Sequence, residues 1–229
     1  MNQPVILHIE TSTHFCSIAL SEGSLCLFTE MNCDGMNHAA LLSIFILHAM
    51  DELNKKNKKL DAIAVSIGPG SYTGLRIGLS TAKGLCYGLD IPLISVNTLE
   101  IMTKQVLNSS FYDNDTLFCP MIDARRMEVF AAVYNSNIEI VREVSADIID
   151  ENSYLEFLKN NQLVFFGNGS AKCKTIINKT NAVFLEHINP LAENMICFSQ
   201  KSFLEKKFVD IAYFEPFYLK EFQTTTPKK

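Results

Sequence analysis

The sequence predicts an α/β fold of two lobes, each built on a mixed β-sheet flanked by helices. Two observations support this prediction. Three consecutive strands at the start of the chain are followed by alternating helices and strands, and the same order of elements begins again at about residue 115. The chain has 229 residues, and domains of roughly 110 residues are large enough to bury their own cores.

The first half is expected to open with a meander of three strands, because short apolar runs alternate with turn residues. We place these strands at Val5 to Glu10, Phe15 to Leu20 and Leu25 to Glu30. A helix should follow from about His38 to Asn54, with Asn37 as its N-terminal cap and a run of lysines at its end.

The rest of the first half should alternate between buried strands and helices. We expect a strand over Ala62 to Ile67, a helix over Gly74 to Gly88, a strand over Pro92 to Val96 and a helix opened by Asn97 or Thr98.

The second half repeats the three-strand opening. Its predicted strands are Leu117 to Ile122, Met127 to Tyr134, Ile138 to Ser145 and, after a helix from about Ser153 to Asn160, Leu163 to Phe166. A helix from roughly Pro190 to Lys206 should close this half. Two such halves are typical of the actin, Hsp70 and sugar-kinase class.

The limits that we expect are residues 1–100 for the first lobe, 101–215 for a smaller or degenerate second lobe, and 216–229 for a C-terminal tail. Within that tail only Thr224 to Lys229 looks loose.

A glycine-rich turn after the strand at residue 62 is the most informative segment. It reads Gly68, Pro69, Gly70, Ser71, Tyr72, Thr73, Gly74 and leads into a helix. Glycines before a helix N-terminus suggest an anion cradle in general terms, with positive φ angles and close backbone approach. The spacing G-x-G-x-x-x-G is one residue too long for the dinucleotide fingerprint, and no Gly-Lys-Ser/Thr follows for a Walker loop.

Composition indicates an ordinary globular protein, with 48% apolar and 20% charged residues. The longest apolar stretch, Ala39 to Met50, is shorter than the roughly 20 residues that span a bilayer, and no signal peptide is recognisable. We expect a cytoplasmic protein without membrane contact. The seven cysteines show no C-x-x-C pair, so reduced and mostly buried thiols are expected.

Catalytic and metal-binding patterns are missing from the sequence. Two helical histidines share a metal only at a spacing of three or four, whereas His38 and His48 are ten apart. No Cys-His or Gly-x-Ser-x-Gly nucleophile arrangement is present. We therefore expect no catalytic residue and no metal, and nothing in the sequence supports ATP or ADP as a cofactor.

The two long helices of the first half carry more apolar surface than one sheet needs. On the first, Leu42, Phe45, Ile46, Ala49 and Leu53 form the inward stripe, while Leu41, Ile44 and Leu47 lie outside it. On the second, Arg76, Ser80, Lys83 and Tyr87 form a polar face beside a flank of Ile77, Thr81, Gly84 and Gly88. Either these residues pack against the chain's own loops, or they form an association surface.

Three motifs resemble those of the TsaB family, the dimerisation subunits of the bacterial machinery that makes threonylcarbamoyladenosine in tRNA. The motifs are His8 to Leu20, Gly68 to Gly78 and Asp123 to Val129, with a further match at Glu215 to Leu219. The resemblance covers residues 5 to about 135 well. The catalytic relative TsaD holds a metal with H-x-x-x-H, whereas here His38 is followed four residues later by Leu42.

The resemblance implies an actin-like fold and a non-catalytic partner for TsaD, with the ATPase TsaE joining the complex. It also implies that the helices of the first lobe form a bundle with the partner, or with a second copy when the chain is alone. The expected interface residues are Leu41, Ile44, Leu47, His48, Arg76, Ile77, Ser80, Thr81, Lys83 and Tyr87. With a net charge of −5, the chain should meet tRNA only through the complex.

A vestigial phosphate site is the second site hypothesis. In active actin-like enzymes an acid ends the first strand and hydroxyls follow it; here Glu10 holds the place of the acid, and Thr11, Ser12 and Thr13 follow it. The candidate site combines Glu10, Thr11 and Ser12 with the glycine turn 68–74. Glu is one methylene longer than Asp, which argues against a tightly organised cation. The rival for the three hydroxyls is ordinary hairpin chemistry. The alternative function is an autonomous ATP-dependent phosphotransferase or ATPase of the same fold.

Overall fold

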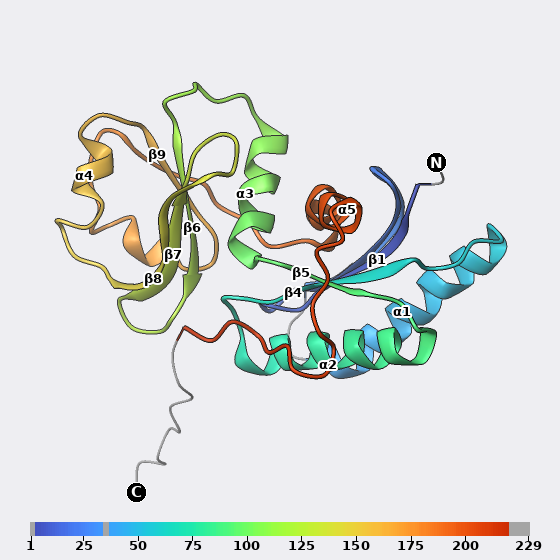
Figure 1. The fold of residues 1–229 in the computed structure, drawn as a ribbon. Helices are drawn as coiled ribbons and strands as arrows, with labels where there is room; N and C mark the ends of the chain where they lie inside the picture. The colour runs from blue at the N-terminus through green and yellow to red at the C-terminus, as the bar shows by residue number, and fades with distance from the viewer. Residues whose placement is uncertain (1–2, 34–36, 220–229) are drawn as a thin grey trace, which may run out of the picture.

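The structure is a computed structural model that describes residues 3–33 and 37–219. Two lobes lie side by side, and each contains one five-stranded sheet (Figure 1). The expected looseness of Thr224 to Lys229 lies outside the described residues. The predicted fold class, two mixed sheets flanked by helices, is confirmed.

The first sheet consists of β1 (Val5–Glu10), β2 (Cys16–Glu22), β3 (Leu25–Asn32), β4 (Ala62–Ser66) and β5 (Leu93–Val96), in the order β3-β2-β1-β4-β5. β1, β2 and β3 are antiparallel, whereas β4 and β5 run parallel to β1. All twelve positions from Val5 to Glu10 and from Cys16 to Ser21 are buried, because helices cover both faces of this sheet.

The second sheet repeats this arrangement with β6 (Leu117–Asp123), β7 (Glu128–Tyr134), β8 (Ile140–Ile148), β9 (Leu163–Phe166) and β10 (Ala182–Phe184). Its order is β10-β9-β6-β7-β8. Read from the other edge, as β8-β7-β6-β9-β10, it matches the order of the first sheet strand for strand. The predicted internal repeat is therefore confirmed. The short strand β10 was not predicted.

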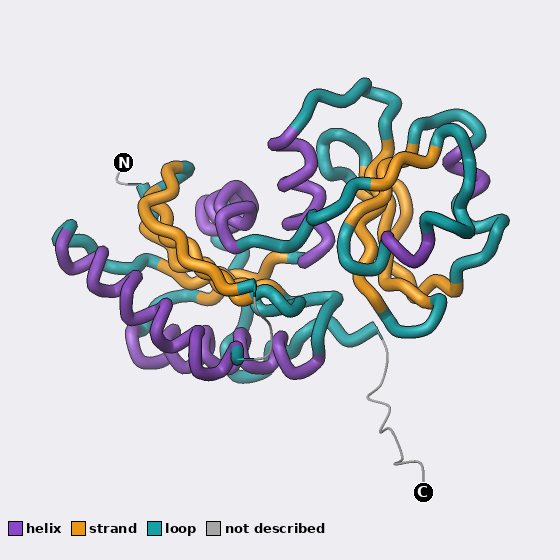
Figure 2. Tube along the Cα trace, turned by 180° about the vertical axis from the view of Figure 1, so that it is seen from behind, coloured by secondary structure: helices purple, strands orange, loops and turns teal. Residues whose placement is uncertain are grey.

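The helices distinguish the lobes. In the first, α1 (His38–Lys55) and α2 (Tyr72–Leu89) follow β3 and β4 and lie on one face of the sheet (Figures 1 and 2). The corresponding places in the second lobe hold only the single turns α4 (Leu155–Leu158) and η1 (Ala171–Cys173). The predicted helix from Ser153 to Asn160 is thus shorter than expected.

The inward stripe predicted for the first helix is confirmed, because its five members are the buried residues of α1. Asn37 occupies the predicted cap position, but its side chain makes no capping hydrogen bond. α2 begins two residues earlier than predicted, because the Ser71 hydroxyl accepts a hydrogen bond from the Gly74 amide and caps the helix there.

The helix expected to close the second half packs elsewhere. The segment 190–206 forms η2 (Ala192–Met195) and α5 (Ile196–Leu204), which contact β1, β2 and β5 on the face opposite α1 and α2. Ala192 and Met195 pack with Ile6 and Ile94 in one apolar cluster. The prediction was wrong because an amphipathic helix does not specify which sheet it covers.

The lobes are joined by α3 (Thr98–Ser109), which follows β5 and packs against β6 and β7. Asn97 caps it, as predicted, by accepting a hydrogen bond from the Leu99 amide at 2.8 Å. None of the helices in the described part of the chain is both long and apolar enough to cross a membrane.

Candidate functional site

The turn after β1 is buried beneath the start of α2. Thr11 and Ser12 are fully buried, as is Glu10 at the end of β1. The Thr11 hydroxyl donates a hydrogen bond to the Gly74 carbonyl at 2.8 Å, and the Ser71 amide donates to the Ser12 carbonyl at 2.6 Å. These hydroxyl and carbonyl groups therefore join the turn to the glycine segment, which neither the phosphate interpretation nor simple hairpin chemistry anticipated.

The glycines of this segment are explained by the same contact. A Cβ at Gly70 would overlap the Ser12 carbonyl, and a Cβ at Gly74 would overlap the Thr11 carbonyl. Only Gly68 has the positive φ that the sequence suggested for the whole turn, at +114°. The close backbone approach predicted from the glycines is thus made to the chain's own first turn.

Glu10 occupies an unusual electrostatic position. Its Oε1 accepts a hydrogen bond from the Ser12 amide, while its Oε2 is buried with no hydrogen-bond partner among the described residues. Burial raises the pKa of the Glu10 carboxyl, and the hydrogen bonds from Ser12 and Ser66 oppose that rise.

The histidines are separate from one another. His38 on α1 hydrogen-bonds the Thr13 carbonyl at 2.8 Å through Nε2, and His8 is buried in the first sheet. His48 pairs with Glu30 at 2.8 Å. Within residues 3–33 and 37–219, no group of three metal-ligating side chains is found.

The outer surface of α1 and α2 combines exposed apolar residues with polar ones. Ile44 and Leu47 on α1 are 46% and 60% exposed, and Tyr87 on α2 is 81% exposed. Leu41 and Ile77 are only partly exposed, because each also packs against the core of the first lobe. Arg76 and Ser80 are exposed, and Thr81 and Lys83 are half-buried.

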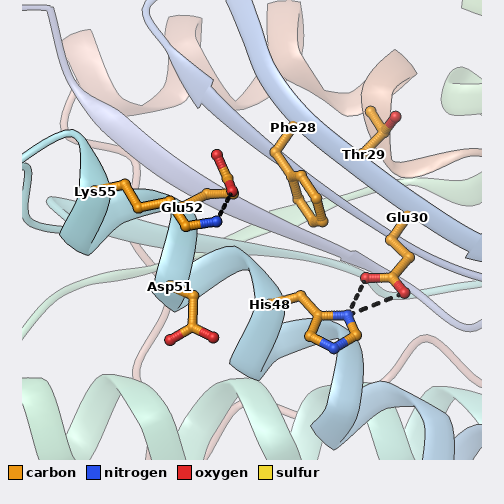
Figure 3. A pocket seen from close by; sticks show the side chains of 7 residues that line it. All are labelled: Phe28, Thr29, Glu30, His48, Asp51, Glu52 and Lys55. Carbon is orange, nitrogen blue, oxygen red and sulfur yellow. Dashed lines mark hydrogen bonds and ion pairs between the residues drawn. The ribbon is translucent and has the colours of Figure 1, made fainter.

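A groove of about 440 Å³ lies beside this surface, between the edge strand β3 and the second half of α1 (Figure 3). Its lining residues are Phe28, Thr29, Glu30, His48, Asp51, Glu52 and Lys55. In Figure 3 the His48–Glu30 pair bridges the strand and the helix, while Lys55 pairs with Glu52 along the helix. His48 is thus engaged within the chain.

The C-terminal segment adds a feature that sequence reasoning missed. After α5 the chain crosses the edge of the first sheet, where the Val209 amide donates to the Leu93 carbonyl at 2.9 Å (Figure 1, red). It then runs beside the glycine segment, where the Phe217 amide donates to the Ile67 carbonyl at 2.8 Å. We call residues 208–219 the strap. The motif Glu215 to Leu219 was the only sequence signal for it.

In the second lobe, the turn at the end of β6 is also held by contacts within the chain. Lys172 forms an ion pair with Asp123, and the Asp123 amide donates to Asn168 Oδ1 at 2.9 Å. Gly167 has a φ of +100°, and a Cβ at Gly169 would press on the backbone of β6. Here too the glycines serve contacts within the chain.

Solved structures share this fold. A crystal structure described as an uncharacterized protein similar to peptidase YEAZ, from Pseudomonas aeruginosa, superposes with a TM-score of 0.81 at 22% identity, covering 95% of this chain and all of that one. A second, YeaZ from the same organism, gives 0.79 at 21% identity, covering 94% of this chain and 100% of that chain.

Sequence comparison decides the family. The model of the family described as TsaD, tRNA N6-adenosine threonylcarbamoyltransferase, matches residues 35–226, which is well over half of the chain, so the chain falls within that family in the wide sense. The tRNA threonylcarbamoyladenosine biosynthesis protein TsaB of Bacillus subtilis is 30% identical over 178 residues, 75% of this chain and 74% of that protein. The chain belongs to the TsaB family. The TsaB of Escherichia coli is 28% identical over 94% of both chains. The resemblance to TsaB stated from the motifs is confirmed.

Proposed function

We propose that this TsaB-family chain is a non-catalytic interaction subunit in the biosynthesis of threonylcarbamoyladenosine in tRNA, where it supports transfer of the threonylcarbamoyl group to the adenosine 3′ of the anticodon. It binds a TsaD-like catalytic subunit and, with it, a TsaE-like ATPase. The observation that carries the proposal is the exposed apolar ridge on α1 and α2 formed by Ile44, Leu47 and Tyr87.

The glycines of α2 give independent support. Gly74 and Gly78 have no room for a side chain, because Thr11 lies against both. Gly84 faces open space, with no atom of the described chain within 4 Å of an added Cβ, although glycine inside a helix costs about 1 kcal/mol relative to alanine. A neighbour outside the chain that approaches the helix backbone closely gives this glycine a role.

The buried state of the β1 turn supports the absence of catalysis in the proposal. A carboxylate that places a metal-nucleotide must reach solvent or ligand, whereas Glu10 is fully buried and its neighbour Ser12 is held beneath α2. The backbone of the turn after β1 occupies the space beside the glycine segment that a bound phosphate would need.

The interface that we propose contains the ten residues named from the sequence, but they differ in how much of each side chain is free to contact a partner. Ile44, Leu47 and Tyr87 form its exposed centre, while Leu41 and Ile77 also support the core of the first lobe. In isolation the same ridge pairs with a second copy of the chain. Because the net charge is −5, tRNA is engaged through the complex rather than by this chain alone.

The test is to mix the purified chain with the TsaD-like subunit of the same organism and measure complex mass by sedimentation, then to add tRNA, the threonylcarbamoyl donor and TsaE and quantify the modified nucleoside. A stoichiometric complex, and modification that depends on this chain, are expected. Failure to form the complex would overturn the proposal. Turnover of ATP by the chain alone at an ordinary enzymatic rate would favour the autonomous phosphotransferase instead.

A further inference from the structure

Arg76 on α2 is held in one position by two tyrosines from distant parts of the chain. Tyr72 lies one helical turn before it, and the Arg76 Cζ sits 4.0 Å from the centre of that ring. Tyr218 comes from the strap, and its hydroxyl accepts a hydrogen bond from Arg76 Nε at 3.0 Å. The two tyrosine rings also contact each other, with 5.1 Å between centroids.

The strap itself is firmly placed. Val209 bridges to β5, Phe214 packs on the core of the first lobe, and the Phe217 amide bonds the Ile67 carbonyl directly before Tyr218. The Phe217 carbonyl also lies against Gly68, where a Cβ would collide with it. Contacts with the sheet and with the glycine segment therefore hold the backbone next to Tyr218 in place. The hydrogen bond from Arg76 to the Tyr218 hydroxyl in turn holds the Arg76 side chain in place.

The guanidinium held in this way has unused binding capacity. Arginine carries five N–H donors, and the side-chain acceptors that Arg76 meets in the described structure are the two tyrosine hydroxyls of Tyr218 and Tyr72, which leaves further N–H groups for a ligand. Among residues 3–33 and 37–219, Arg76 forms no ion pair, and its side chain is exposed. A planar guanidinium with further N–H groups matches a carboxylate in bidentate geometry.

The charge pattern of α2 favours an acidic counterpart. The helix contains two charged residues, Arg76 and Lys83, both cationic and two turns apart on the outer face, and it contains no acid. That face is continuous with the exposed side chain of Tyr87 and with the ridge assigned to the protein partner. A protein carboxylate therefore fits this location better than a nucleic-acid phosphate.

We propose that the strap is part of the partner interface: Tyr218 and Tyr72 preposition the Arg76 guanidinium to receive an aspartate or glutamate side chain of the catalytic subunit. Tyr218 is a positioning residue, and Arg76 makes the contact. The inference rests on the proposed function, because it names the chemistry of the partner surface that α2 meets.

The test measures the affinity of the full chain for the TsaD-like subunit by calorimetry at low and high salt. Arg76→Gln should weaken binding by roughly tenfold or more and flatten its salt dependence. Tyr218→Phe keeps the ring and removes the acceptor, and should weaken binding by roughly threefold. Tyr213→Phe removes a hydroxyl from the same strap at a side chain that is 85% exposed, and should bind as the wild type does.

A double-mutant cycle separates positioning from general support of the fold. In the Arg76→Gln background, Tyr218→Phe should have no further effect on affinity, because the group that it positions is gone. An equal effect of Tyr218→Phe in both backgrounds would overturn the positioning role. Wild-type affinity and salt dependence for Arg76→Gln would overturn the whole inference while leaving the complex, and so the proposed function, intact. No complex with the wild-type chain would refute the proposed function itself and this inference with it.

Discussion

His8 and Ser199, which are 191 positions apart in the chain, are joined by a buried hydrogen bond of 2.7 Å between His8 Nε2 and the Ser199 hydroxyl. His8 lies in the middle of β1 and Ser199 on α5, so the bond ties the closing helix to the first sheet. The other ring nitrogen, Nδ1, donates to the Ala19 carbonyl at 3.1 Å, and burial, which lowers the pKa of His8, keeps the imidazole neutral.

This arrangement predicts a pH-dependent stability. Burial lowers the pKa of His8 from 6.5 to about 4, so the unfolded chain binds more protons than the folded one between those values. Stability contributed by neutral His8 is complete above pH 6.5 and is lost as the pH falls toward 4, by up to about 3 kcal/mol. Urea unfolding of wild type and His8→Gln at several pH values measures this contribution. The difference in free energy of unfolding between the two proteins should become smaller as the pH falls. A constant difference would contradict the assignment.

Glu10 should give the opposite pH dependence. Its folded-state pKa is raised by burial, so the protonated acid is favoured in the folded state and stability is lost as the pH rises through that pKa. Glu10→Gln remains neutral at every pH. Relative to wild type, this variant should therefore gain stability as the pH increases from acidic to alkaline, as followed by thermal unfolding. The same free-energy difference at both extremes would show that Glu10 ionises freely in the folded protein.

Two glycines of α2 should respond to alanine in opposite directions. Gly74→Ala should destabilise the fold by about 3 kcal/mol or more, because the new Cβ overlaps the Thr11 carbonyl. Gly84→Ala, the matched control on the same helix, meets no atom of the chain and should stabilise it by about 0.5–1 kcal/mol. Chemical denaturation measures both. If Gly74→Ala left stability unchanged, the turn after β1 could not be packed beneath α2 as described.

The apolar ridge on α1 predicts which substitution separates association from folding. Leu47→Glu should leave the unfolding midpoint close to that of wild type, because Leu47 is 60% exposed, yet weaken association roughly 100-fold or more by burying an unpaired charge.

The matched control is Phe111→Glu, which removes a fully exposed apolar side chain in the loop after α3, away from α1 and α2. Sedimentation of both variants, alone and with the partner, provides the comparison. Loss of association in both variants, or in neither, would remove α1 from the interface. Leu41 and Ile77 are poorer probes, because each also packs on the core.

Much of the first lobe could be predicted, because its periodic patterns are long. The stripe of α1 identified its buried residues correctly, and the meander of β1, β2 and β3 appeared within two residues of its predicted limits. The repeat in the second lobe was also recognisable, although β10 has only three residues and lies below the length at which a pattern is visible.

The candidate site was harder to interpret from the chain alone. The glycine segment was correctly located, but its purpose was read as a cradle for an anion. Its actual neighbour is the carbonyl of Thr11, more than sixty positions earlier, and nothing in the local sequence names that neighbour. Tyr218 was part of a recognised motif, yet its role depends on meeting Arg76, 142 positions away.

The sequence by itself determined the class of fold, the alternation of elements, the inward faces of the helices and the family, because each is encoded in residues close together or in short motifs. Only the tertiary structure decided that α5 covers the first sheet, that the β1 turn fills the glycine segment, and that the strap holds Arg76. Those outcomes depend on contacts between residues far apart in the chain. Such contacts contribute to stability only in the folded protein, where the two surfaces meet, so the local sequence does not reveal them.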